Sequence, residues 1–366
     1  MRRAFAFLAV VAAIVILAAC GEKKDDGRLR VVLVATDGLR WQEVFGGVDS
    51  SVINCGSIRG GDRVKELYWK DSREERRAAL MPFTWDYVAQ NGILIGDRES
   101  GSSFGVTNEK WFSYPGWSEI ICGHADDEFI TSNHPGPNRN VSVMECANND
   151  DRYRGKVLAF GSWDAFTDII NEARAGFPVN CGAFYTFPEG YVPTEKEAYI
   201  HRLQDGVPEY LGAVRSDAIT QEYALEAMRS RHPEFLFVGF AETDDWAHTR
   251  RYDQTMFSCH NFDRYLKELW ECAQSDPFYK DRTVFIVTTD HGRGSNPEQW
   301  PDHGNPKAPG SGETWCMIFG AGIPAKGVLT SGEYHTNQVA PTVAKWLGIE
   351  LPSHKGQGEA LDMERF

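Results

Sequence analysis

Carboxylate and imidazole side chains follow three separate apolar, β-branched runs of the sequence. These side chains are Asp37, then Asp244 with His248, then Asp290 with His291. The four-residue spacing of Asp244 and His248 lets one turn of helix aim both at the same point. Carboxylate oxygens and imidazole nitrogens are common ligands of divalent metal ions. Three such groups in one chain predict a metal centre.

The elements that must position these residues are a set of strands and helices. Short apolar runs predict buried strands at residues 30–36, 157–160, 235–241, 283–289 and 315–320. Helical stretches are predicted at residues 216–229, 256–273 and 337–347. Strands alternating with helices predict an α/β fold, with a central, mostly parallel sheet and helices on both faces. Ligands bind at the carboxyl ends of such strands, which is where the acidic residues lie.

Two segments, residues 40–77 and 187–211, are rich in charge, Gly and Pro. Such segments are typical of lid or cap insertions above a sheet. The chemical motifs are scattered from Asp37 to His303 and must converge, so residues 29–366 are predicted to form a single domain.

The N-terminus has the order of a secretory signal. Arg2 and Arg3 precede an apolar run that ends in Leu17-Ala18-Ala19-Cys20 and is short for a membrane span. The ending resembles a bacterial lipobox, so residues 1–19 are predicted to be a lipoprotein signal peptide and residues 20–28 a lipidated tether. The alternative is an uncleaved anchor. We expect an exported bacterial lipoprotein, anchored through lipid on Cys20 at the periplasmic or surface face of the outer membrane.

The composition limits the partners of the chain. Its formal net charge is −14, which makes nucleic acid a poor partner for the surface as a whole. Bound metals can still attract an anionic substrate locally. Seven cysteines remain after Cys20, an odd number that predicts at least one free thiol. No Cys-x-x-Cys pair occurs, so a thiolate metal site is not expected.

Five blocks of the sequence resemble the alkaline phosphatase superfamily, specifically its nucleotide pyrophosphatase/phosphodiesterase-like branch. In the order of the family they are residues 31–38, 113–123, 242–248, 288–292 and 302–304. The second block begins Ser113-Tyr114-Pro115 and the last is Asp302-His303-Gly304. The resemblance covers roughly residues 30–350, and the ordered set is far more specific than any one block.

The resemblance implies a role for each matched residue. One metal ion would be held by Asp244, His248 and His303. The other would be held by Asp37, Asp290 and His291, with Ser113 beside it as nucleophile. The two divalent ions would be zinc, with manganese as the alternative. His335 is a rival for His303, which we prefer because it carries the His-Gly pair and precedes the strand at 315–320.

The implied chemistry is hydrolysis of a small-molecule phosphate ester through a phosphoseryl intermediate. Alone, Ser113-Tyr114-Pro115 would indicate only a helix start, and Thr107 and Ser118 remain alternative hydroxyls. Asn133 lies where phosphodiesterase relatives place an asparagine against a phosphoryl oxygen. Lys110 and Arg293 are candidates for phosphate contacts or for solvated charges.

Three alternatives stay open at this point. A sulfatase would need Cys/Ser-x-Pro-x-Arg, but Trp117 stands where Arg belongs and Gly38 follows Asp37. Cofactor-independent phosphoglycerate mutase and phosphopentomutase share the metal scaffold, but the predicted export disfavours them. A non-catalytic binding lipoprotein would lack a ligand, whereas the full set is present. With no basic residue assigned to a monoester's extra charge, the sequence slightly favours a phosphodiester over a monoester.

Overall fold

The computed structural model describes residues 27–207 and 212–366. The predicted signal peptide and Cys20 lie outside the described residues, as does most of the predicted tether.

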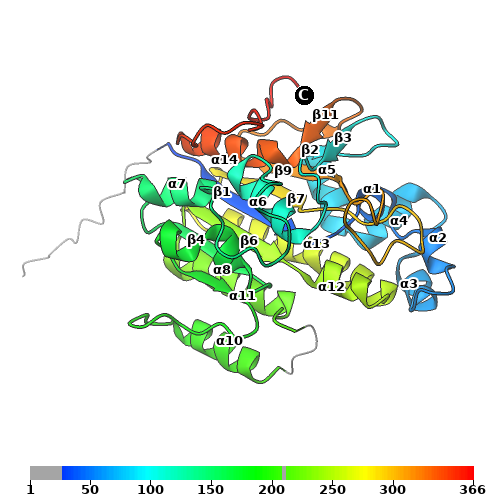
Figure 1. Ribbon diagram of the computed structural model, residues 1–366, viewed down its shortest axis with the longest axis horizontal. Coiled ribbons are helices and arrows are strands. Elements are labelled where there is room, and N and C mark those ends of the chain that lie inside the picture. The colour runs from blue at the N-terminus through cyan, green and yellow to red at the C-terminus, as the bar shows by residue number, and fades with distance from the viewer. Residues whose placement is uncertain (1–26, 208–211) are drawn as a thin grey trace, which may run out of the picture.

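The centre of the molecule is an eight-stranded sheet in the order β10-β2-β9-β7-β1-β6-β4-β5 (Figure 1). Its strands are β1 (Arg30–Thr36), β2 (Gly92–Ile95), β4 (Val157–Gly161), β5 (Val179–Cys181), β6 (Phe235–Phe240), β7 (Thr283–Thr289), β9 (Cys316–Gly320) and β10 (Gly327–Val328). All five predicted strands are present, and the predicted α/β fold with a mostly parallel sheet is confirmed. The exception to the parallel order is β9, which runs antiparallel to both β7 and β2.

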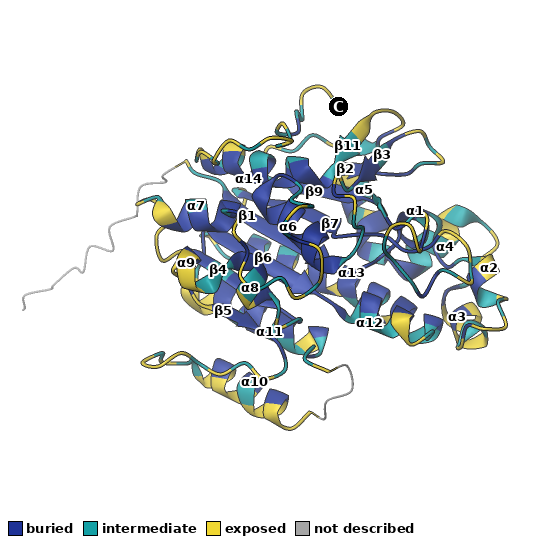
Figure 2. Cartoon of the chain, viewed as in Figure 1, coloured by how far each residue is buried: buried dark blue, intermediate teal, exposed yellow. Residues whose placement is uncertain are grey.

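Alternate residues of β1 face opposite sides of the sheet, and each side is covered by helices (Figure 2). Val32 and Val34 pack with one group of helices, and Val31 and Leu33 with the other. The first group comprises α1 (Trp41–Gly46), α2 (Ser50–Ile53), α3 (Gly61–Tyr68), α4 (Arg73–Leu80), α10 (Glu195–Asp205), α11 (Asp217–Arg231), α12 (Glu242–His248) and α13 (Tyr252–Ser275). The second comprises α6 (Ser113–Cys122), α7 (Val143–Asn149), α8 (Phe166–Ile170), α9 (Glu172–Ala175) and α14 (Val339–Leu347).

The two predicted insertions form helices. The first folds into α1 to α4, followed by a π-helical turn (Thr84–Val88) and α5 (Ala89–Asn91). The second contains α10, which lies at the lower edge of the molecule in Figure 1. A separate three-stranded sheet joins β11 (Glu333–His335), β3 (Ser103–Gly105) and β8 (Glu313–Thr314), and a short 3-10 turn (Thr336–Gln338) follows β11.

The seven cysteines after Cys20 are all free thiols. Burial raises the pKa of the Cys122 thiol to about 12, so this thiol stays protonated and inert at neutral pH. Within residues 27–207 and 212–366, no helix has the length and apolar character that crossing a bilayer requires.

Candidate metal centre

Five of the six predicted ligands lie at the carboxyl ends of three adjacent strands, and His303 lies in the loop after β7. Asp37 follows β1, Asp290 follows β7, and α12 follows β6 with Asp244 one turn before His248. Strand β1 pairs with β6 on one side and with β7 on the other. Because the three strands are parallel, their carboxyl ends meet at one edge of the sheet.

The first group of ligand atoms comprises Asp37, Asp290 and His291, all three buried. The Nε2 atom of His291 is 3.1 Å from Oδ1 of Asp37 and 3.6 Å from Oδ2 of Asp290. Nδ1 of His291 lies 2.7 Å from the carbonyl oxygen of Gly292. That bond requires a proton on Nδ1 and leaves Nε2 as the atom facing the carboxylates, an arrangement common in metal-bound histidines.

The second group comprises Asp244, His248 and His303. Nε2 of His248 is 3.0 Å from Oδ2 of Asp244 and 2.9 Å from Nε2 of His303. Asp244 and His303 also form a compact set with His291, whose Nε2 is 4.0 Å from Oδ1 of Asp244. His291 therefore lies between the two groups and can contribute to either.

The two rival histidines lie in different places. The side chain of His303 is only 13% exposed and lies against Asp244. His335 is at the end of β11, where its Nε2 is 3.5 Å from Oε1 of Glu333. The fold thus brings His303 to the cluster, whereas His335 belongs to the small sheet.

Ser113 is the first residue of α6, and its side chain reaches the first group of ligands. Its Oγ is 3.3 Å from Oδ1 of Asp37 and 3.3 Å from Nε2 of His291. The residue is only 5% exposed. Trp117, one turn later, donates its indole N–H to Oδ2 of Asp37 at 3.1 Å. A hydroxyl this close to the ligand atoms is well placed to be activated by a bound cation.

Helix α6 approaches the cluster through Gly116. A Cβ atom built on Gly116 would lie 2.2 Å from the carbonyl oxygen of Asp290, far inside van der Waals contact. The absence of a side chain at this position therefore sets the distance between Ser113 and the metal ligands.

We expect the substitution Gly116→Ala to push α6 away from the end of β7. A displacement of about 1 Å at a reacting group costs roughly 100-fold in rate, so hydrolysis should fall by about that factor. Gly56→Ala is the matched control, because a Cβ at Gly56 meets no atom within 4 Å. Rates and melting temperatures of both variants check the prediction, and a Gly116→Ala enzyme with undiminished rate contradicts it.

Asn133 lies next to the start of α6. Its Oδ1 accepts a hydrogen bond of 3.0 Å from the backbone N–H of Tyr114. The orientation of the amide is fixed by this bond, which leaves Nδ2 as the group for another acceptor.

Arg293 is buried, so the interpretation of this residue as a solvated charge is wrong, and its hydrogen bonds go to the protein. The residue is 1% exposed, and its Nε donates to the carbonyl oxygen of Trp300 at 2.8 Å. Its two remaining nitrogens donate to the carbonyl oxygen of Pro301 and to Oδ1 of Asp244. Arg293 thus fastens the loop that carries His303 to the candidate metal ligand Asp244. This role depends on backbone carbonyls seven and eight residues away and leaves no pattern in the sequence.

The charges of the cluster fit a bound cation. Burial, together with the neighbouring Asp37 carboxylate, raises the pKa of Asp290 well above its usual range. Burial lowers the pKa of His291, but Asp290 and Asp37 outweigh it and raise that pKa to about 9. Oδ2 of Asp290 is buried and accepts no hydrogen bond. A divalent cation would stabilise these close carboxylates of like charge, one of which has an oxygen without a hydrogen-bond partner. Carboxylate oxygens and imidazole nitrogens are also suitable ligands for such a cation.

Comparison with known proteins agrees with this chemistry. Residues 196–345 match the Metalloenzyme superfamily. This match covers about two fifths of the chain. The chain is also similar to the 2,3-bisphosphoglycerate-independent phosphoglycerate mutase of Wolinella succinogenes, with 33% identity over 133 residues. That match covers 36% of this chain and 24% of the relative, so the chain spans about a quarter of its length.

Several solved structures share the fold at low sequence identity. The lipoteichoic acid synthase LtaP from Listeria monocytogenes has a TM-score of 0.57 at 14% identity, covering 91% of this chain and 74% of that one. The wild-type alkaline phosphatase PafA has a TM-score of 0.56 at 10% identity, covering 91% and 98%. Murine ectonucleotide pyrophosphatase/phosphodiesterase 5 has a TM-score of 0.54 at 12% identity, covering 90% and 97%.

Proposed function

We propose that this metalloenzyme hydrolyses phosphate esters, diesters in preference to monoesters, through a covalent intermediate on Ser113. The observation that carries the proposal is the position of the Ser113 hydroxyl. It lies 3.3 Å from both Asp37 and His291, at the meeting point of the candidate metal ligands.

Two divalent cations, zinc or manganese, would be held by Asp37, Asp290 and His291 and by Asp244, His248 and His303. When bound, such ions lower the pKa of a nearby hydroxyl and offset the negative charge of the ester and of the leaving oxygen. The first of these sets is one of the two compact groups of donor atoms in the cluster, and the second shares Asp244 and His303 with the other group, in which His291 takes the place of His248.

The side chains of this protein act on the phosphorus centre in sequence. Oγ of Ser113 passes its proton to water, attacks phosphorus and forms the phosphoseryl bond, while the bond to the leaving alcohol breaks and that oxygen takes up a proton from water. A water molecule then attacks the same phosphorus, and the Ser113 oxygen leaves and regains a proton from the attacking water. Asn133, held by Tyr114, offers its Nδ2 group to a phosphoryl oxygen. The surrounding burial excludes bulk water and strengthens each of these interactions.

The preference for diesters rests on the state of Arg293. A monoester carries an additional negative charge, which a free guanidinium would stabilise. Arg293 already uses three of its five N–H groups on Trp300, Pro301 and Asp244, and its charge is paired with the Asp244 carboxylate, which leaves it a weak partner for a second phosphoryl oxygen.

The test compares two substrates, 4-nitrophenyl phosphate and bis-4-nitrophenyl phosphate, on protein starting after Cys20 and supplied with zinc or manganese. We expect the higher kcat/KM on the diester and no turnover with a chelator. A preference for the monoester would overturn the specificity, and metal-independent turnover would overturn the mechanism. Mass spectrometry of the Ser113 peptide separates the sulfatase alternative, because a formylglycine there would replace the nucleophile.

The similarity to a phosphoglycerate mutase favours a second candidate, transfer of the phosphoryl group from Ser113 to an alcohol instead of water. With excess glycerol, a transferase would release 4-nitrophenol from the monoester in excess over inorganic phosphate. Equal release would favour hydrolysis.

The anchoring proposal rests on the sequence of residues 17–20. We propose that Cys20 is lipidated and holds the protein on the periplasmic or surface face of the outer membrane. Labelling of cells with an alkyne fatty acid should mark the wild type and leave a Cys20→Ser variant unmarked. Equal labelling of both would contradict the anchor.

A further inference from the structure

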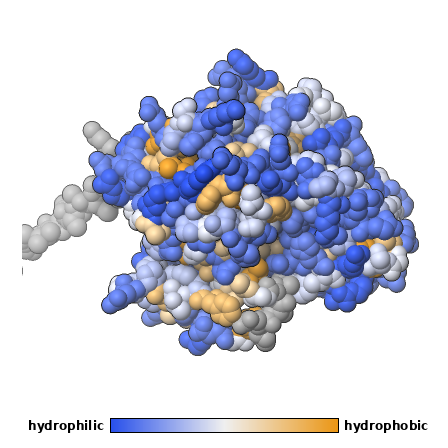
Figure 3. All heavy atoms as spheres, viewed as in Figure 1, coloured by the Kyte–Doolittle hydropathy of each residue, from blue (hydrophilic) through white to orange (hydrophobic). Residues whose placement is uncertain are grey.

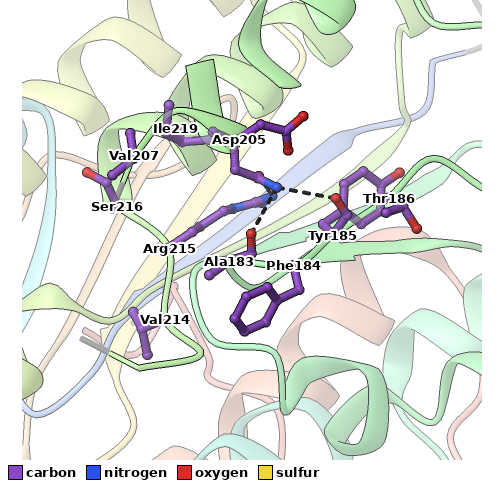
Figure 4. A pocket seen from close by; sticks show the side chains of 11 residues that line it. Ala183, Phe184, Tyr185, Thr186, Asp205, Val207, Val214, Arg215, Ser216 and Ile219 are labelled. Atoms are coloured by element: carbon purple, nitrogen blue, oxygen red, sulfur yellow. Dashed lines mark hydrogen bonds between the residues drawn. The ribbon is translucent and has the colours of Figure 1, made fainter. Parts of the chain in front are cut away.

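A cavity of about 500 Å³ opens beyond the end of β5, outside the metal centre (Figure 4). Its wall is formed by the chain that leaves β5, the end of α10 and the segment before α11. Residues that line it include Phe184, Tyr185, Gln204, Val207, Val214 and Arg215. Nothing in the proposed chemistry of Ser113 uses this cavity.

A buried guanidinium lies in the wall of the cavity. Arg215 is 3% exposed, and its Nε donates to Oγ1 of Thr220 at 2.9 Å. Its Nη2 donates to the carbonyl oxygen of Asn180 at 2.8 Å, and its Nη1 to the Asn180 and Gln204 side chains. These acceptors are all neutral. Among the described residues, the buried carboxyl of Asp217 acts on the charge of Arg215 but forms no ion pair with it, and burial together with Glu242 raises the pKa of Asp217 well above its usual range.

A buried cation without a counter-ion is costly and is stabilised by an anion that can reach it. Burial lowers the pKa of Arg215 to about 10, so the group remains charged at neutral pH. Asp205 also lines the cavity, but its side chain is 66% exposed at the rim, where water screens its charge.

The mouth of the cavity is apolar. Among the described residues, seven large apolar side chains are conspicuously exposed, and five of them fall between positions 184 and 207: Phe184, Val192, Tyr199, Leu203 and Val207. Phe184 is 64% exposed and lines the cavity together with Val207. Figure 3 shows apolar side chains gathered at the lower edge of the molecule, the region of α10. Exposed apolar patches of this kind often mark binding sites.

The cavity lies along the same edge of the sheet as the metal centre. Strand β5 is separated from β6 by β4 alone, and neighbouring strands lie about 4.8 Å apart. Ser216, which lines the cavity, donates from its Oγ to Oε1 of Glu242 at 2.9 Å. Glu242 begins α12, the helix of Asp244. A ligand of roughly 10–15 Å could therefore reach from one site to the other.

We propose that this cavity binds an organic anion with an apolar or aromatic body, which contacts Phe184 while its charged group meets Arg215. One part of this inference rests on the proposed function. When the phosphate of a substrate lies at the metal centre, the cavity would hold the far end of the alcohol that leaves the phosphate.

Two matched probes test the site without any turnover. 8-Anilinonaphthalene-1-sulfonate carries the charge, and N-phenyl-1-naphthylamine has the same aromatic body without it. On zinc-loaded protein we expect fluorescence titration to show tighter binding of the sulfonate. Phe184→Ala should weaken both probes about tenfold, whereas Phe257→Ala, which removes an exposed phenyl group on α13, should weaken neither.

The charge is tested by Val214→Asp against Val214→Asn. The aspartate would add a negative charge to the cavity wall and should weaken the sulfonate about tenfold more than the asparagine does, with little difference for the neutral probe. Equal affinities across these variants would overturn the proposal. The two Val214 variants are preferred to Arg215→Gln, because that substitution would also remove the hydrogen bonds from the guanidinium to Asn180.

Inhibition separates the cavity from the catalytic proposal. If the sulfonate competes with bis-4-nitrophenyl phosphate in the wild type but not in Val214→Asp, the cavity holds part of the substrate. If the sulfonate binds but does not compete, the cavity still binds an organic anion, and only its role in holding part of the substrate is overturned. Binding by a protein that hydrolyses no ester leaves the cavity standing and removes the proposed function instead.

Discussion

Ser113→Ala should lower the hydrolysis of bis-4-nitrophenyl phosphate by at least about 1,000-fold, because the phosphoseryl bond can no longer form. The substitution removes one oxygen atom and leaves Asp37 and His291 in place. Metal content and melting temperature should therefore change little. Stopped-flow and steady-state measurements of 4-nitrophenol release, with metal analysis of the same samples, check the prediction.

Two further variants make this result specific. Ser118→Ala removes another buried hydroxyl of α6, one that accepts a hydrogen bond from Nδ2 of Asn138 at 2.9 Å, and should retain turnover. Ser113→Thr keeps a hydroxyl and should retain part of the rate. Full turnover by Ser113→Ala would refute the covalent mechanism.

His291→Ala should release both metal ions, a larger loss than any other single ligand substitution. Its Nε2 lies within 4.0 Å of three carboxylates, and His291 belongs to both compact groups of donor atoms. His248 contacts only the group of Asp244 and His303, so His248→Ala should release one ion. A site held at 1,000 times its dissociation constant contributes about 4 kcal/mol of stability. The melting temperature should therefore fall in the order wild type, His248→Ala, His291→Ala.

His335→Ala is the control for this series. His335 contacts Glu333 in the small sheet, so the His335→Ala variant should keep its full metal content. Metal analysis by plasma mass spectrometry after dialysis decides the outcome. The assignment of ligands fails if His335→Ala loses an ion or if His291→Ala keeps both.

The sheet could be predicted from the sequence wherever a strand is long and apolar. Strands β1 and β7 were predicted with their observed bounds, because seven consecutive buried residues leave a strong pattern. Short strands such as β5 and β10, of three and two residues, carry too little pattern to be recognised. The antiparallel direction of β9 could not be predicted either, since an apolar run reads the same in both directions. The single domain over residues 29–366 stays a prediction.

The convergence of the candidate ligands could be predicted because their residue types are chemically restricted and their order resembles that of a family, whereas their binding of metal stays a prediction. The surrounding contacts could not be predicted. Trp117 donates to Asp37, and the Thr243 hydroxyl donates to the carbonyl oxygen of the same residue. Tryptophan and threonine occur in many structural roles, so only the folded chain shows which of them touch a ligand. The burial of Arg293 is of the same kind.

The position of β1 in the sheet also affects how the chain is made. β1 is the first strand of the sheet to leave the ribosome, yet its neighbours are β6 and β7, which end at residues 240 and 289. Contacts so distant in sequence form slowly. A growing chain therefore carries β1 with both edges unpaired through most of its synthesis, a period in which unpaired strands are prone to aggregate.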